Sequence, residues 1–259
     1  MTQAPAPTDP RSQAPLLQQL AALDLLGSRI PSSPGLAQLL GDEIDLADSI
    51  TLASALTSLD RARPMGNASM EAPQRQFLNA RAGMLRLIAN CFEPGEAPAP
   101  YPLPQPTTET LSDPAEGFKP LQRFYSLLQS ELDHRASTLR RSLRAAMGYE
   151  GPALIKLAAL DRIIDDTLGD YSRRVLATVP KLLGEHFRRQ REIFLQSDDA
   201  AQQTRPADWM QADGWMHDFY RDMQTLLLTE LDFRLLPARA LLDSLQDALP
   251  TDREQQEHS

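Results

Sequence analysis

The stretch that decides the fold is ALIKLAALDRIIDDTLGDYSRRVLATVP, residues 153–180. Its larger apolar residues recur at steps of three, four or seven, the spacing of a helix face that packs against other helices. The positions of this face are Leu154, Leu157, Ile164, Leu168, Tyr171, Val175 and Val179, and Leu182 continues the spacing just beyond the stretch. The pattern predicts a long helix that reaches about Phe194, and Pro180 is expected to kink it or split it in two.

A second stretch with the same periodicity precedes it and begins near Phe118. Its apolar positions are Leu121, Tyr125, Leu128, Leu132, Ala136, Leu139, Leu143 and Ala146. Between the two stretches, Gly148 and Gly151 suit the end of one helix, and Pro152 suits the first turn of the next. Together the two arms predict a long antiparallel helical hairpin from Phe118 to Phe194, the centre of a helical bundle.

Composition extends this prediction to the whole chain. Leu and Ala dominate, aromatic residues are few, and runs of β-branched residues are absent. Such a mixture favours an all-α fold outside the proline-rich stretches. The single cysteine, Cys91, excludes an internal disulfide and is expected to be a small buried hydrophobe. No secretory signal and no apolar run of about 18 residues is visible, so a soluble cytoplasmic protein is expected.

The positions of the prolines predict the domain organisation. Prolines occupy alternate positions from Pro98 to Pro106, a spacing that excludes a helix or a central strand and predicts an extended, semi-rigid spacer. The predicted organisation is a disordered tail at 1–14, an N-terminal helical module at 15–92, a Pro-rich linker at 93–117, a C-terminal helical bundle at 118–250 and a disordered tail at 251–259.

Three helices are expected in the N-terminal module, at 16–26, 35–59 and 73–92. The second carries an apolar stripe that includes Leu36, Leu40 and Ile44. Its N-terminal half is crowded with acids: Asp42, Glu43, Asp45 and Asp48. Acids near a helix N-terminus offset the helix dipole, and the stretch lacks the glycine and glutamate positions of a calcium loop.

A last helical region is expected to start near Pro206 and to be well formed from Trp215 to Leu236. Pro237 is expected to interrupt it, with a shorter helix at 238–249. One broad apolar face includes Trp215, Phe219, Met223, Leu226, Leu227, Leu231 and Leu235. Either the hairpin alone covers this face, or the face buries a second protomer and gives a homo-oligomer.

Charge is distributed unevenly along the chain. The net charge is −9, yet residues 135–191 hold 12 Lys/Arg against 6 Asp/Glu. Two interpretations follow: acidic flanking helices of the same chain dock on the basic hairpin, or a basic patch contacts phosphate or an acidic partner. The predicted partner-binding residues are Arg173, Arg174, Lys181, Arg188, Arg189 and Arg191, with Trp215 and Phe219 on the apolar face.

Candidate chemistry is sparse. The acids Asp161, Asp165, Asp166 and Asp170 resemble the aspartate-rich magnesium site of helical prenyl-transferring enzymes. No second acidic helix accompanies them, and Arg162, Arg173 and Arg174 are near enough to pair with them. The four histidines, His134, His186, His217 and His258, are scattered without metal-ligand spacing. We therefore predict no catalytic residue, no metal site and no cofactor.

Four blocks of the sequence resemble a known family. They are LAQLLGDEIDLADSI at 36–50, LAALD at 157–161, LATVPKLL at 176–183 followed by His186 and Phe187, and LLLTELDFRLLP at 226–237. The chain is similar to domain of unknown function 3348, a proteobacterial family without an assigned activity. It departs from the family pattern at Glu43 and Leu46, where tryptophan is expected.

The resemblance also implies a setting. Genes of this family tend to lie near those for a proton-channel subunit of the MotA, TolQ and ExbB type and for a protein with an OmpA-like peptidoglycan-binding domain. It therefore implies a cytoplasmic accessory of an ion-driven envelope complex, peripheral at the inner membrane. Our main prediction is a non-enzymatic helical interaction protein. The alternatives are nucleic-acid binding through the basic hairpin and a magnesium-dependent helical enzyme that uses the four aspartates.

Overall fold

The structure is a computed structural model that describes residues 16, 18, 19, 71–93, 98–148, 151–201 and 203–248. Those residues form helices joined by turns and loops, without a strand, which confirms the predicted all-α fold. The tails predicted at 1–14 and 251–259 lie outside the described residues. So do all of the helix predicted at 35–59 and nearly all of the one predicted at 16–26.

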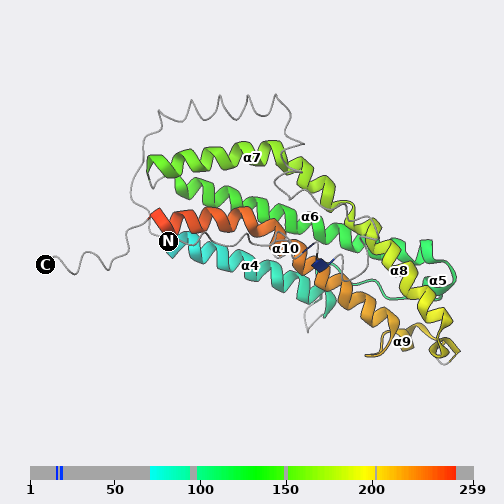
Figure 1. The fold of residues 1–259 in the computed structure, drawn as a ribbon. Helices are drawn as coiled ribbons and strands as arrows, with labels where there is room; N and C mark the ends of the chain where they lie inside the picture. Colours follow the sequence, from blue (N-terminus) through cyan, green and yellow to red (C-terminus); the bar gives the residue numbers. More distant parts are fainter. Residues whose placement is uncertain are drawn as a thin grey trace, which may run out of the picture. The chain divides into compact units, whose positions relative to one another are not determined.

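Figure 1 shows the described helices in chain order. They are α4 (Glu71–Phe92), α5 (Thr108–Ser112), α6 (Pro114–Met147), α7 (Pro152–Leu176), α8 (Val179–Gln196), a 3-10 helix (Asp198–Ala201), α9 (Pro206–Trp209) and α10 (Trp215–Ala248). The predicted turn separates α6 from α7, and Gly151 adopts a φ of 128° there, a conformation that favours glycine. The second arm is divided into α7 and α8 just before Pro180, as expected.

The chain divides into two compact units. Of the described chain, unit 1 contains residues 16, 18, 19, 87–93, 98–129, 176–201 and 203–233, and unit 2 contains residues 71–86, 130–148, 151–175 and 234–248. Helices α4, α6 and α10 contribute residues to both units, whereas α8 belongs to unit 1 and α7, except for Leu176, to unit 2. Each unit takes residues from both sides of the Pro-rich stretch.

Aromatic side chains form the centre of unit 1. Phe187 from α8 and Phe219 from α10 are fully buried, with ring centroids 5.3 Å apart. Phe118 from α6 packs on Phe187 at 5.4 Å, and Trp215 packs on it at 5.5 Å. Each such pair adds about 0.5 to 1.5 kcal/mol beyond the burial of its area. This cluster therefore holds α6, α8 and α10 together within unit 1.

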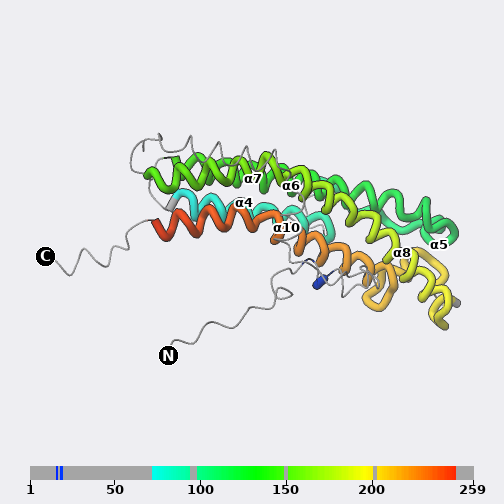
Figure 2. Tube along the Cα trace, turned by 45° about the horizontal axis from the view of Figure 1, so that its top comes forward, coloured from blue at the N-terminus to red at the C-terminus, as the bar shows by residue number. Residues whose placement is uncertain are grey.

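Aliphatic side chains form the centre of unit 2. In Figures 1 and 2, α7 lies along the C-terminal part of α6. The buried residues come mainly from α4, α6 and α10: Met84, Leu132, Ala136, Leu139, Leu143, Met147, Leu235, Ala238, Leu241, Leu242 and Leu245. All the predicted core positions of the first arm are buried except Ala146, which is partly exposed. The periodicity of that arm therefore identified its packed face correctly.

The predicted core stripe of the second arm is wrong at several positions. Ile164 is 39% exposed and Val175 is 44% exposed, whereas Leu183 and Phe187 are fully buried. Helix α7 carries apolar residues on two sides, so its periodicity does not select one face. The break after Leu176 also shifts the phase, because α8 starts a new helix with its own orientation.

The predicted interruption at Pro237 is also wrong, because α10 runs through this residue without a break. Proline inside a helix removes one backbone hydrogen bond and costs about 3 kcal/mol. The neighbouring residues Leu235, Ala238, Leu241 and Leu242 are buried. A few buried leucines, at about 2 kcal/mol each, outweigh the local cost.

The Pro-rich stretch is anchored to unit 1. The Tyr220 hydroxyl of α10 donates a hydrogen bond of 2.5 Å to the Pro104 carbonyl, and Arg191 of α8 donates one of 2.7 Å from Nε to the Leu111 carbonyl. The short helix α5 and the first residues of α6 lie inside the range predicted to be extended. Residues 98–113 therefore form a strap along unit 1.

Two helical glycines provide a matched test of packing. A Cβ atom on Gly184 would lie 2.8 Å from Cε1 of Phe118, whose ring is held by Phe187 and Phe219, whereas one on Gly83 would meet nothing within 4 Å. We predict that Gly184→Ala lowers the free energy of unfolding by about 1 to 3 kcal/mol and that Gly83→Ala raises it by about 1 kcal/mol. Urea unfolding measures both, and equal effects would contradict the packing of Phe118 against α8.

The strap gives a prediction that depends on pH. Burial raises the pKa of Tyr220 well above its ordinary value. The folded state therefore keeps the neutral phenol, and stability is lost as pH rises above about 10, where the unfolded tyrosine ionises. We expect Tyr220→Phe to cost about 1 kcal/mol at neutral pH. The variant should also lose less stability than the wild type between pH 9 and pH 11. If the wild type and Tyr220→Phe lost the same stability over this pH range, the result would argue against burial of the Tyr220 hydroxyl.

Candidate functional site

Most of the predicted partner-binding cations lie on exposed helix surfaces. Arg173 and Arg174 are exposed at the end of α7 in unit 2, and Lys181, Arg188 and Arg189 are exposed on α8 in unit 1. Arg173 pairs with Asp170 one turn earlier. Exposed pairs of this kind contribute less than about 1 kcal/mol, so Arg173 stays free to change partner at little cost.

The other three predicted residues are engaged inside unit 1. Arg191 is half-buried and holds the Leu111 carbonyl of the strap. Trp215 and Phe219 belong to the aromatic cluster, and Trp215 also stacks on Phe194 at 5.7 Å. The broad apolar face of α10 is therefore covered by α8 and α6 of the same chain in this unit.

Helix α8 presents two different faces. Leu183, Phe187 and Phe194 point into unit 1 and are buried. The opposite face carries the cations Lys181, Arg188 and Arg189 together with two exposed aliphatic residues, Ile193 (57%) and Leu195 (44%). We call Lys181, Arg188, Arg189, Ile193 and Leu195 the α8 surface. Cations beside exposed aliphatic side chains are typical of a protein-binding patch.

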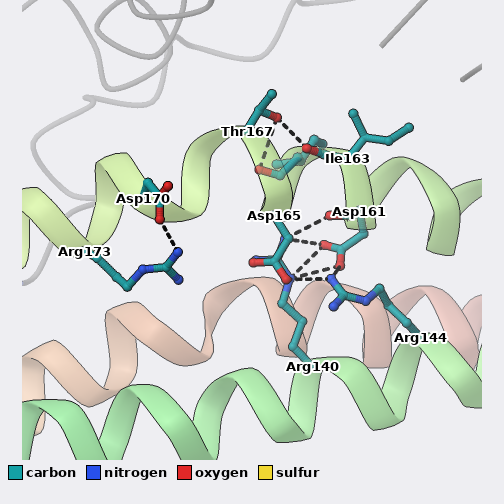
Figure 3. Close-up of polar contacts among 9 residues, drawn as sticks. Arg140, Arg144, Asp161, Ile163, Asp165, Thr167, Asp170 and Arg173 are labelled. Carbon is teal, nitrogen blue, oxygen red and sulfur yellow. Dashed lines mark hydrogen bonds and ion pairs between the residues drawn. The ribbon is translucent and has the colours of Figure 1, made fainter. Parts of the chain in front are cut away.

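The aspartate-rich stretch of α7 is part of an ion-pair network with α6 (Figure 3). Asp161 accepts hydrogen bonds from Arg140 at 2.7 Å and from Arg144 at 2.9 Å. Asp165 accepts from the same two residues, at 2.6 Å from Arg140 and 2.9 Å from Arg144. All four side chains are at most one quarter exposed. Two guanidinium groups therefore balance two carboxylates in a largely desolvated cluster.

Sequence reasoning missed Arg140 and Arg144 as the partners of these acids. The expected partners were Arg162, Arg173 and Arg174, which lie on the same helix as the acids. Of these, Nε of Arg162 lies 3.8 Å from Oδ2 of Asp166, and Arg173 pairs with Asp170. A signal was present in the chain: arginines four residues apart on one arm face aspartates four residues apart on the other. Such matched spacing across a hairpin indicates pairing between its arms.

The network bears directly on the magnesium interpretation. Metal binding requires carboxylate oxygens that are free to coordinate, and those of Asp161 and Asp165 already accept hydrogen bonds from arginine. Asp166 and Asp170 lie on the exposed side and pair with arginines of their own helix. Across residues 71–93, 98–148, 151–201 and 203–248, no group of three or more His, Cys, Asp or Glu side chains is placed to hold a metal.

Two polar groups in the core of unit 1 were also not foreseen. Glu230 is fully buried and accepts hydrogen bonds from the Tyr125 hydroxyl at 2.7 Å and from Gln129 Nε2 at 3.0 Å. Gln129 also donates to the carbonyl of Leu176 at the end of α7. These contacts join α6 to α10 and satisfy a backbone carbonyl at a helix end, so a structural role accounts for them.

His186 forms the second buried polar contact. Its Nε2 lies 2.9 Å from Asp222 Oδ2, and its ring stacks on Phe219 at 5.8 Å. Only 5% of the side chain is exposed, so a substrate cannot reach the ring. The neighbouring Phe187 is fully buried, which excludes the insertion of this ring into a lipid headgroup layer. No described helix is long and apolar enough to cross a membrane.

An open groove of about 850 Å³ runs between α6 and α7 in unit 2. Ser137, Arg141 and Ala145 line its α6 side. Ile155, Ala158, Ala159, Arg162 and Arg173 are among the residues that line its α7 side. Arg144 also lines the α6 side, and Asp165, Asp166 and Asp170 also line the α7 side, so the groove combines small side chains with charges of both signs. The groove is a second candidate binding surface.

The Arg–Asp network predicts unequal roles for neighbouring acids. Asp161→Ala leaves Arg140 and Arg144 partly buried with one carboxylate between them, and we expect it to lower the free energy of unfolding by about 2 to 3 kcal/mol. Asp166→Ala removes only an exposed pair and is expected to change it by less than about 0.5 kcal/mol. Urea unfolding of the two variants checks this, and a neutral Asp161→Ala would show that the network does not hold α7.

Comparison with known proteins places the chain in a family. The pattern of the family described as Protein of unknown function (DUF3348) matches residues 1–247. Neither the curated proteins nor the solved structures include a significant match to this sequence. The match spans nearly the whole chain, including both units, the strap and the region before α4. The chain therefore belongs to the DUF3348 family.

Proposed function

We propose that the protein is a non-enzymatic helical interaction protein whose α8 surface binds an acidic protein partner. The observation that carries the proposal is the composition of this surface, where exposed Lys181, Arg188 and Arg189 lie on the same helix as exposed Ile193 and Leu195. Cations steer and orient an acidic partner, and aliphatic side chains contribute area that is buried on binding.

Charge favours a protein partner over nucleic acid. The described residues of unit 1 include 8 Lys/Arg and 14 Asp/Glu, so the α8 surface is a basic patch on an acidic unit. Glu185 and Glu192 also lie exposed among its cations. A phosphate backbone would be repelled by such surroundings, because nucleic-acid affinity rests on an extended cationic footprint. An acidic protein surface of limited size fits the patch better.

The resemblance stated above suggests the identity of the partner. We propose a proton-channel subunit of the MotA, TolQ and ExbB type, or a protein of the same envelope complex, bound from the cytoplasmic side. In this proposal the protein is peripheral at the inner membrane and uses no cofactor.

Charge reversal tests the α8 surface. The full-length tagged protein is purified from its native cell with membranes solubilised in mild detergent, and proteins that co-elute are identified by mass spectrometry. We expect proton-channel or peptidoglycan-binding subunits with the wild type. The triple variant Lys181→Glu, Arg188→Glu, Arg189→Glu should reduce their recovery at least about tenfold, because repulsion replaces attraction at three contacts.

A matched control separates the surface from net charge. Lys119, Arg123 and Arg221 are exposed cations of the same unit outside the α8 surface. Their triple reversal to glutamate changes the charge equally and should leave recovery intact. The proposal is contradicted if both triple variants lose partner recovery equally, or if the wild-type protein elutes without any partner. Retardation of DNA or RNA that weakens steeply with salt would favour the nucleic-acid alternative.

A further inference from the structure

We propose that the surface of unit 1 beneath residues 102–106 of the strap is a recognition site for proline-rich segments. The chain's own strap occupies this site, and a polyproline II segment of a partner protein binds there by displacing it. Helices α4 and α10 hold this part of the strap, and all the residues involved belong to unit 1. The proposal does not depend on partner binding by the α8 surface, because it uses none of the residues of that surface.

This part of the strap has the conformation and the periodicity of a polyproline ligand. Prolines at alternate positions fix their own φ at about −65° and restrict each preceding residue to extended conformations, which favours polyproline II. Such a helix has three residues per turn. Pro102 and Gln105, which are three residues apart, are exposed. Leu103, Pro104 and Pro106 are half-buried. One edge of the polyproline helix therefore faces solvent, and the other two edges face unit 1.

Tyr220 supplies the hydrogen-bond donor for this segment. Its hydroxyl donates a hydrogen bond of 2.5 Å to the Pro104 carbonyl, and Phe219 packs against its ring with the centroids 6.3 Å apart. A polyproline II backbone makes no internal hydrogen bonds, so its carbonyls are available as acceptors. Aromatic side chains line the sites that bind such segments in other proteins. Because Tyr220 contacts a backbone carbonyl, a segment with a different sequence can accept the same hydrogen bond.

The two halves of the strap are anchored unequally. Residues 107–113 are fixed by the buried side chain of Thr110 and by Arg191, which binds the Leu111 carbonyl. In residues 98–106, all of which the structure describes, no side chain is buried. This first half can therefore leave unit 1 while α5 and the start of α6 stay in place, because its contacts are separate from theirs.

The segment that occupies the site indicates the chemistry of the partner. Leu103, Pro104 and Pro106 lie on the edges that face unit 1, so the site accepts the pattern Leu-Pro-x-Pro. A partner segment with this pattern is already extended and loses little conformational entropy on binding. The tethered strap competes at an effective concentration on the order of millimolar. Release of the strap should therefore raise the affinity for the partner.

Cys91 of α4 reports whether the strap is closed. It is the only cysteine of the chain, it is fully buried, and its sulfur accepts a hydrogen bond from the backbone N–H of Tyr101. Burial also raises the pKa of the Cys91 thiol, which keeps the thiol in its less reactive protonated form. The rate at which Cys91 reacts with an aromatic disulfide reagent therefore measures opening of the strap.

Two double variants of the full-length protein test the opening. Leu103→Ser with Pro104→Ser weakens the edges that face unit 1, and we call this the released variant. Pro102→Ser with Gln105→Ser changes the exposed edge and removes the same number of prolines, so it is the matched control. Cys91 should react at least about tenfold faster in the released variant and at an unchanged rate in the control. Circular dichroism checks that both variants fold.

Binding of a separate peptide provides the second measurement. The probe is a fluorescent peptide of residues 98–107, followed by anisotropy. Its dissociation constant should be at least about tenfold lower for the released variant than for the wild type, because the strap of the variant no longer competes. The bound peptide should also slow the reaction of Cys91 in that variant. Tyr220→Phe, which leaves every strap residue unchanged, should by itself speed the reaction of Cys91 about fivefold.

Three results would overturn the proposal. The first is that the peptide binds neither the released variant nor Tyr220→Phe. The second is equal affinity of the peptide for the released variant and the wild type, which would place its binding elsewhere. The third is a wild-type dimer in sedimentation that the released variant loses and the control keeps, which would assign the site to the strap of a second copy.

Discussion

Helix α7 is held on α6 chiefly by ions. Of its residues, all of which the structure describes, only Leu154 and Leu176 are buried. The four-membered network of Arg140, Arg144, Asp161 and Asp165 compensates for this small apolar contact by fixing both the rotation and the register of α7. Directional, bidentate pairs specify geometry in a way that apolar contact does not. Without this network, the groove beside α7 would have no defined walls.

Unit 1 is stabilised in a different way. Large aromatic side chains from α6, α8 and α10 interlock, and the polar groups beneath them are satisfied by neighbours such as Tyr125 and Gln129 for Glu230. This arrangement uses Trp215 and Phe219 as core residues. What remains for a partner is the opposite face of α8, where charge and exposed aliphatic side chains coexist. The two units therefore present two surfaces of distinct chemistry: a cationic helix face in unit 1 and a long groove in unit 2.

In the strap, the sequence pattern predicts the local backbone conformation correctly but does not predict the contacts with distant helices. Alternating prolines do exclude a long helix between Pro98 and Pro106, as expected from the absence of their backbone N–H groups. The contact of Pro104 with Tyr220 and that of Leu111 with Arg191 join residues more than 75 positions apart. No local pattern reports such contacts, because they depend on which helix face the folded chain brings to the strap.

The sequence by itself determined the all-α class, the hairpin with its glycine turn, the packed face of α6, the break before Pro180 and the apolar face of α10, because each depends on residue propensity or spacing along one helix. Tertiary structure alone decided which face of α7 is buried, that α10 continues through Pro237, and that Asp161 and Asp165 pair with Arg140 and Arg144. It also decided that Trp215 and Phe219 are buried in the core of unit 1 and that Arg191 binds the Leu111 carbonyl of the strap. These outcomes depend on contacts between segments distant in the chain, where burial and charge pairing outweigh local preference.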